Sequence, residues 1–228
     1  VYSGGGISNF RLDTYSGLKI VNSTISGNAV TNQAGRGGGL YAFLYNDTYG
    51  AGLEATITNS TITGNSAEEG GGIFTMAGYP AITPSFAKVH NTIIAGNINL
   101  TAAASDVAGD GFHVSSSFNL IGPGGSGGLT NGGTNQNIVL SDPQPTGLAP
   151  LDYYGGPTKT HALLAISAAV DAGSNAKAVA ANDSPLIVDQ RGISRPLDIG
   201  SSASADRTVD IGAFELSFSD LLAQPLIS

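Results

Sequence analysis

The acidic residues are the side chains of this sequence best suited to chemistry, and their spacing limits what they could do. A glycoside hydrolase needs two carboxyl groups across one glycosidic bond, one acting as acid and the other as base or nucleophile. Residues 1–122 contain few carboxylates, and none recurs at a spacing that would cluster it with another: Asp13, Asp47, Glu54, Glu68, Glu69, Asp106 and Asp110. The sequence therefore predicts that the chain is not an enzyme.

Basic residues give no stronger case for catalysis. A lyase acting on uronate sugars needs a base near the sugar and cations that neutralise the carboxylate, but Lys19, Arg36 and Lys88 stand isolated. The histidines lie far apart, with no carboxylate at zinc-ligand spacing: His90, His113 and His161. A carbohydrate-active enzyme or a glycan-binding module for acidic polysaccharide is therefore kept only as the alternative hypothesis.

Calcium is the one metal for which the sequence offers ligands. Asp106 and Asp110 lie in a stretch rich in small residues, where backbone carbonyls could complete an oxygen shell. Their spacing matches no EF-hand loop, and aspartates in such loops more often cap turns. The prediction is therefore no cofactor, with calcium at these two residues as the alternative.

An aromatic-rich insertion offers a binding surface of another kind. It contains Tyr41, Phe43, Tyr45 and Tyr49. Aromatic rings combine apolar area with a polar rim, so they could stack on sugar rings or contact a partner protein. They could equally pack over the flank of the fold, and both interpretations stay open.

Two repeated phrases show which elements must carry these residues. An Asn-Ser-Thr-Ile-Ser-Gly-Asn phrase at 22–28 recurs in similar form at 59–65 and 91–97, and a triple glycine at 4–6 recurs at 37–39 and 70–72. Periods of 20 to 50 residues indicate a solenoid of stacked coils. Apolar residues alternate with Thr, Ser and Asn from 18 to 25 and from 55 to 62, which predicts strands. The Gly-Asn pairs suit left-handed corners.

The second half of the sequence loses the repeat. We predict coils over 1–122, an irregular continuation and cap over 123–216, and a linker or tail over 217–228, with a short helix at 160–165. Opposite charges gather near the end of the cap, and we expect a buried ionic network there that closes the C-terminal end of the solenoid: Asp189, Arg191, Arg195, Asp210 and Glu215.

Several phrases in this half resemble a known family. They are Gly-Gly-Pro-Thr-Lys-Thr-His at 155–161, Ala-Val-Asp-Ala-Gly at 169–173, Asp-Gln-Arg-Gly at 189–192 and Asp-Ile-Gly-Ala-Phe-Glu at 210–215. Together with the repeats, they resemble the bacterial choice-of-anchor Q domain family over residues 1–216. The resemblance implies an all-β, right-handed parallel β-helix of the pectin-lyase-like superfamily, in a surface-attached or secreted protein. It brings no catalytic residues.

The composition fits this expectation and excludes other classes. The 228 residues include 33 glycines and no cysteine, only 11% are charged, and the net charge is −8. Such a chain lacks disulfides and the basic clusters that nucleic acids require, and it has no apolar run long enough to insert in a membrane. We therefore expect a structural or adhesive module, extracellular or at the cell surface. Its expected partners are neighbouring modules or subunits of the same protein, which could stack on its coil ends, and surface glycans.

Overall fold

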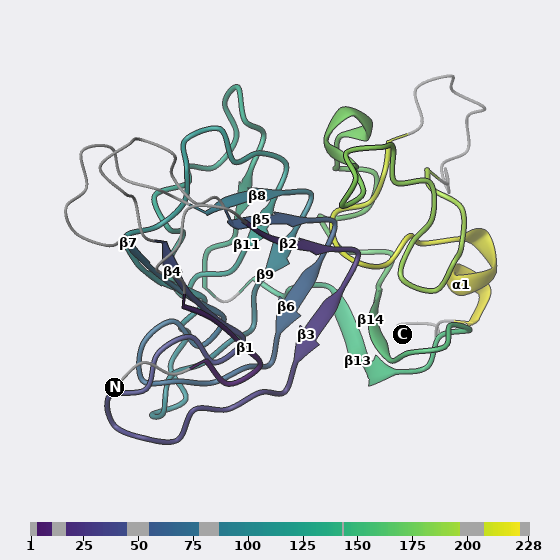
Figure 1. Ribbon diagram of the computed structural model, residues 1–228. Helices are drawn as coiled ribbons and strands as arrows, with labels where there is room; N and C mark the ends of the chain where they lie inside the picture. The colour runs from purple at the N-terminus through teal and green to yellow at the C-terminus, as the bar shows by residue number, and fades with distance from the viewer. Residues whose placement is uncertain are drawn as a thin grey trace.

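The structure, a computed structural model, describes residues 4–10, 17–44, 55–77, 87–142, 144–196 and 208–223. Its main feature is a stack of short parallel strands (Figure 1). The predicted parallel β-helix is confirmed. The first, second and third coils each contribute one strand to each of three parallel sheets, so strands one repeat apart in sequence lie side by side.

The first sheet follows the triple glycines and has the order β1-β4-β7-β10. Its strands are β1 (Ile7–Phe10), β4 (Leu40–Leu44), β7 (Ile73–Ala77) and β10 (Val107–Gly109). The glycines are required because the next coil approaches too closely for a side chain. A Cβ at Gly38 would lie 2.4 Å from the carbonyl oxygen of Gly71.

The other two sheets flank each first Asn of the repeated phrase. One has the order β2-β5-β8, with β2 (Leu18–Val21), β5 (Ala55–Thr58) and β8 (Lys88–His90). The other has the order β12-β11-β9-β6-β3, with β3 (Thr24–Ser26), β6 (Thr61–Thr63), β9 (Ile93–Ile94), β11 (Leu120–Ile121) and β12 (Ile138–Val139). We refer to this last sheet as the β3–β12 sheet.

The corner between these two sheets corrects the strand prediction. Residues 18–25 form two strands and not one, because Asn22 takes a left-handed conformation with φ 54°. Asn59 and Asn91 repeat the bend with φ 45° and 49°. Asparagine tolerates this region better than most residues, since its short polar side chain can bond locally. The predicted Gly corners are also present, with Gly27, Gly64 and Gly96 at φ 66° to 74°.

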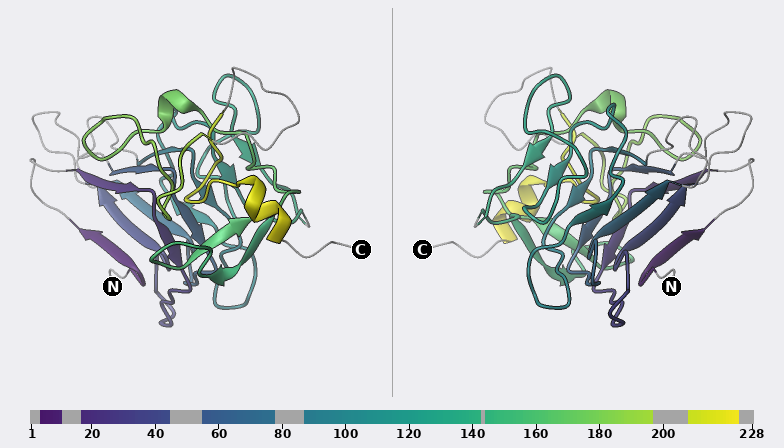
Figure 2. Two further views of the ribbon diagram at one scale, coloured as in Figure 1. Left: turned by 90° about the vertical axis from the view of Figure 1, so that its right-hand side faces the viewer. Right: turned by 90° about the vertical axis from the view of Figure 1, so that its left-hand side faces the viewer.

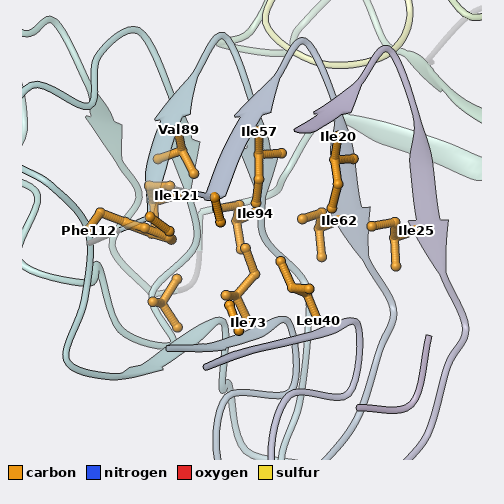
Figure 3. Packing of buried hydrophobic residues seen from close by; sticks show 14 of the residues in the cluster. Ile20, Ile25, Leu40, Ile57, Ile62, Ile73, Val89, Ile94, Phe112 and Ile121 are labelled. Atoms are coloured by element: carbon orange, nitrogen blue, oxygen red, sulfur yellow. The ribbon is translucent and has the colours of Figure 1, made fainter. Parts of the chain in front are cut away.

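The interior of the stack is a set of aliphatic ladders. Ile20, Ile57 and Val89 align on one sheet, and Ile25, Ile62, Ile94 and Ile121 align on the β3–β12 sheet, as Figure 3 shows. Ile57 and Ile62 are completely buried. Because burying one such side chain contributes about 1.5–3 kcal/mol, these ladders are the main stabilising element of the stack.

The C-terminal part differs from expectation in three places. Parallel pairing continues past 122, because β12 pairs with β11. Residues 160–165, predicted as a helix, instead contain β14 (Thr160–Leu163), which pairs antiparallel with β13 (Leu148–Asp152). Within the predicted tail, residues Phe218–Ala223 form the helix α1. Inside the predicted cap, a 3-10 turn, η1, spans Asn175–Lys177. Tertiary pairing overrides the local preference in β14.

A second core joins this C-terminal part to the flank of the stack. It combines outward-facing residues of the β3–β12 sheet, such as Ile93 and Leu120, with Leu163, Ile211 and Phe214. In Figures 1 and 2 the green and yellow C-terminal segments accordingly lie beside the coils. The C-terminal part is thus a lateral cap.

Candidate functional site

A ladder of hydrogen-bonded asparagine side chains runs through the Gly-Asn corners. The side-chain amide of Asn28 donates to Asn65 Oδ1 at 2.9 Å, Asn65 donates to Asn97 Oδ1 at 2.9 Å, and Asn97 donates to Asp106 Oδ1 at 2.9 Å. The backbone N–H of each asparagine donates to the same oxygen as its side chain. Every rung thus points its donor along the stack in one direction.

Asp106 ends this ladder because a carboxylate only accepts. Its second oxygen accepts the backbone N–H of Gly124 at 3.0 Å, and its side chain is completely buried. Burial raises the pKa of Asp106, while the three N–H donors oppose the shift. In the residues that the structure describes, no group of three or more histidines or carboxylates could hold a metal ion. The contacts of Asp106 are those of a turn-capping residue, and the suggested pairing with Asp110 in a calcium site gains no support from them.

The opposite end of the ladder is open. The repeat positions that are fully buried in the second and third coils are partly exposed in the first. Asn65 and Asn97 are 0% exposed whereas Asn28 is half-buried, and Ser60 is 0% exposed whereas Ser23 is half-buried. The same residue types differ in exposure because no described residue stacks on the first coil.

The edge strands of this open face carry few protective features. β1, β2 and β3 each lie at the edge of their sheet. Natural proteins shield such edges with lysines, prolines or bulges. Among the described residues of these strands Lys19 is the only charged one, and its ammonium group bonds Asp183 of the cap at 2.8 Å. We call the surface formed by β1, β2, β3 and Asn28 the N-terminal face.

The C-terminal end of the stack is closed by its own turn. Asn131 Oδ1 accepts the backbone N–H of Val139 at 3.0 Å, and Gly132 donates to the carbonyl of Asn137 at 2.7 Å. Leu129 is 7% exposed and belongs to the interior core. These contacts occupy polar groups beside β12 and fill the end of the core, so the two ends of the stack differ.

The structure brings the five predicted cap residues together. Asp189 accepts from Arg191 Nε at 2.8 Å, and Glu215 accepts from Arg195 at 3.1 Å, with all four side chains 0–2% exposed. Asp210 joins through its backbone N–H, which donates to Glu215 Oε2 at 3.0 Å. Burial and the nearby Glu215 raise the pKa of Asp210 well above its ordinary value. Burial also lowers the pKa of Arg195, against the attraction of Glu215.

The place of this network corrects the prediction that it closes the C-terminal end. Arg195 donates to Asn22 Oδ1 in the first coil at 3.4 Å, and the adjoining Ala213 donates to Thr61 in the second at 3.0 Å. Gly212 donates to the carbonyl of Asn91 in the third coil at 2.8 Å. The network therefore lies along the flank of the coils. The reason is the apolar outer surface of the β3–β12 sheet, which must be covered.

A sequence signal for this docking was present in the repeats. The outward position held by Thr24 and Thr61 is Ile93 in the third coil, and Ala95 stands where Ser26 and Thr63 stand. Ile93 and Ala95 are completely buried in the second core. An outward position that turns apolar in one repeat marks the place where another element packs.

The aromatic cluster is split by the structure. The ring of Tyr41 is 0% exposed and stacks on Phe74 at a centroid distance of 5.8 Å, so neither of its faces is open to a sugar. Phe43 is half-buried, and Tyr45 and Tyr49 lie outside the described residues. For Tyr41, the structure favours packing on the coil flank.

Comparison of the chain with protein-family models, with curated proteins and with solved structures found no match. Over the residues that the structure describes, no helix has the length and apolar character needed to span a membrane. Among the described residues, the N-terminal face is the surface where repeat positions buried elsewhere in the stack are exposed.

Proposed function

We propose that this chain is a structural or adhesive module of a bacterial surface or secreted protein, which joins further β-helix coils through its N-terminal face. The observation that carries the proposal is the exposure of first-coil positions that are 0% exposed in the next two coils. In a solenoid each coil is stabilised by its neighbours, so a face left open is a place where another coil adds stability.

The direction of the amide ladder specifies the chemistry of the partner. Each Oδ1 along the ladder accepts an N–H and a side-chain amide from the preceding rung, as Asn65 does from Asn28. At the open end, Asn28 Oδ1 would accept from a preceding coil in the same way. A second N-terminal face would set acceptor against acceptor, which opposes a face-to-face pair. The expected partner is therefore a parallel coil of the same repeat type, in a neighbouring module or subunit.

The decisive experiment adds such a coil. A copy of residues 37–69 placed directly before Gly4 recreates the natural junction between Glu69 and Gly70. We expect the extended protein to unfold at a higher temperature, and the amides of Ser23 and Asn28 to gain protection from hydrogen exchange. The control is the same extension with the copies of Ile57 and Ile62 replaced by serine, which cannot fill the core. Equal stability and equal protection in both proteins would contradict the proposal.

Association of the original chain can be measured by sedimentation at increasing concentration. Ser8→Lys places a charge on the exposed part of β1, and Thr130→Lys places the same charge at the closed end. Head-to-tail association of copies should be weakened by both substitutions. Association that only Ser8→Lys weakens would show face-to-face pairing and would contradict the inferred direction of the amide ladder. Release of reducing sugar from uronate polymers, or binding on a glycan array, would instead support the carbohydrate-directed alternative. Fractionation of the native cells tests the proposed surface or secreted location.

A further inference from the structure

Ser26 and His161, which are 135 residues apart in sequence, meet where the lateral cap packs on the first coil. Ser26 Oγ lies 2.8 Å from His161 Nε2, and His161 Nδ1 lies 2.8 Å from the carbonyl oxygen of Ala149. A carbonyl oxygen only accepts, so Nδ1 carries the proton of the neutral ring and Nε2 presents a lone pair. The hydroxyl of Ser26 therefore donates to Nε2.

This arrangement is that of a nucleophile and an oriented base. In serine hydrolases the base accepts the hydroxyl proton at one ring nitrogen, while an acceptor on the other nitrogen fixes the tautomer and orientation. Here a backbone carbonyl takes the place of the usual carboxylate. Burial lowers the pKa of His161, which favours the neutral ring that a base requires.

The residue that follows Ser26 is open to solvent. Ser26 is half-buried, and the next residue, Gly27, is exposed with φ 71°. No heavy atom lies within 4 Å of where a Cβ of Gly27 would be. Within the described parts of the chain, the backbone N–H of Gly27 has no hydrogen-bond acceptor. An N–H adjacent to a nucleophile is the type of donor that stabilises an oxyanion.

Two other serine–histidine pairs lack this combination. His90 Nδ1 lies 3.0 Å from Ser117 Oγ, but Ser117 is only 4% exposed, so no substrate can reach it. His113 Nδ1 contacts Ser115 at 2.7 Å within one turn, and the same nitrogen also accepts the backbone N–H of Ser115. Among these three pairs, only that of Ser26 and His161 combines a half-buried serine with a ring whose other nitrogen is held by a separate acceptor.

We propose that Ser26 is a nucleophile activated by His161 and accepts acyl groups from small, activated esters. Ser26 Oγ attacks the ester carbonyl carbon as its proton passes to His161 Nε2. The tetrahedral intermediate collapses, the bond to the leaving alcohol breaks, and that alcohol takes the proton from Nε2. Water, deprotonated by the same nitrogen, then hydrolyses the acyl-serine and restores both residues. This ester-cleaving reactivity departs from the sequence-based prediction that the chain is not an enzyme, and it is independent of the proposed assembly function.

The test uses the full chain with an alkyl fluorophosphonate, which forms a stable bond to activated serines and releases fluoride. We expect peptide mass spectrometry to place the adduct on Ser26 of the wild-type protein, a result that needs no variant. Ser26→Ala and His161→Gln should each lower the labelling rate at least tenfold. Ser23→Ala is the matched control, because it removes another half-buried hydroxyl from the same coil, and it should label like the wild type.

Hydrolysis of p-nitrophenyl acetate gives a second readout. Its rate should rise with pH as His161 loses its proton, and the Ser26→Ala variant should lose this dependence. Circular dichroism of each variant shows whether the cap and coils remain folded. The proposal is overturned if the wild-type adduct lies on another residue, if no adduct forms, or if folded Ser26→Ala protein reacts as fast as the wild type.

Discussion

Replacing Asn65 by alanine removes the central rung of the amide ladder, and the cost can be worked out from its contacts. The side-chain amide donates to Asn97 Oδ1 at 2.9 Å, to the carbonyl of Ile25 at 3.0 Å and to that of Thr63 at 3.1 Å. Its oxygen accepts the backbone N–H of Asn28 at 3.0 Å and the side-chain amide at 2.9 Å. The variant therefore loses contacts with five polar groups, which the two amide hydrogens and the one oxygen of Asn65 share, at a completely buried position.

A buried hydrogen bond contributes about 1 kcal/mol net, and an orphaned buried partner costs more. We expect Asn65→Ala to lower the free energy of unfolding by about 3–5 kcal/mol, a large share of the roughly 5–15 kcal/mol typical of a domain. Asn28→Ala is the matched control at the open end. Its amide donates to Asn65 Oδ1 and, at 3.3 Å, to the carbonyl of Ser26, and the residue is half-buried. We expect a loss of about 1 kcal/mol.

Urea unfolding followed by far-ultraviolet circular dichroism measures both values, provided that the slope with urea is unchanged. Asn65→Asp tests the direction of the ladder, since it sets a carboxylate oxygen against Asn97 Oδ1 and should destabilise although it matches asparagine in shape. The reasoning is refuted if Asn28→Ala costs as much as Asn65→Ala, or if Asn65→Asp is neutral at pH 7.

Three further predictions concern the coils and the cap. Burial lowers the pKa of His90 from 6.5 to about 4. The neutral ring therefore contributes stability that is fully present above pH 6.5 and is lost as the pH falls towards 4, by at most about 3 kcal/mol. Urea unfolding at pH 7 and pH 5 should show this fall in the free energy of unfolding in the wild type and a smaller fall in His90→Gln. Arg195→Met leaves the carboxylate of Glu215 buried without its ion-pair partner at 3.1 Å, which should lower the free energy of unfolding by about 3–5 kcal/mol. Adding Glu215→Gln should restore part of this lost stability. If thermal unfolding shows no recovery, the pairing is not the cause of the loss. Gly212→Ala places a methyl group on a backbone with φ 110°, within 2.8 Å of Ile93 Cδ1. This strain should lower the free energy of unfolding by about 1–3 kcal/mol. Limited proteolysis should then cut the cap, but not the coils, faster than in the wild type.

The corners and the interior of the stack could be predicted because they depend on local pattern. Alternating residues such as Ile57 and Ile62 showed which side chains point inward, and both are completely buried. The triple glycines showed where coils approach each other. The bend at Asn22 was missed because asparagine is only one of several residues that tolerate a left-handed backbone, so the pattern alone did not separate one strand from two.

The sequence by itself determined the parallel stack and the residues of the ionic network, because repeated spacing and opposite charges are properties of the chain. Only the tertiary structure decided where the network lies. The apolar outward positions at Ile93 and Leu120 draw the C-terminal part against the flank, while Leu129 and Asn131 close the end of the stack. The meeting of Ser26 with His161 follows from that docking. Contacts between segments so far apart in sequence depend on which surfaces remain to be buried once the coils have formed; the apolar residue at position 93 marks where another element packs, but it does not specify which segment packs there.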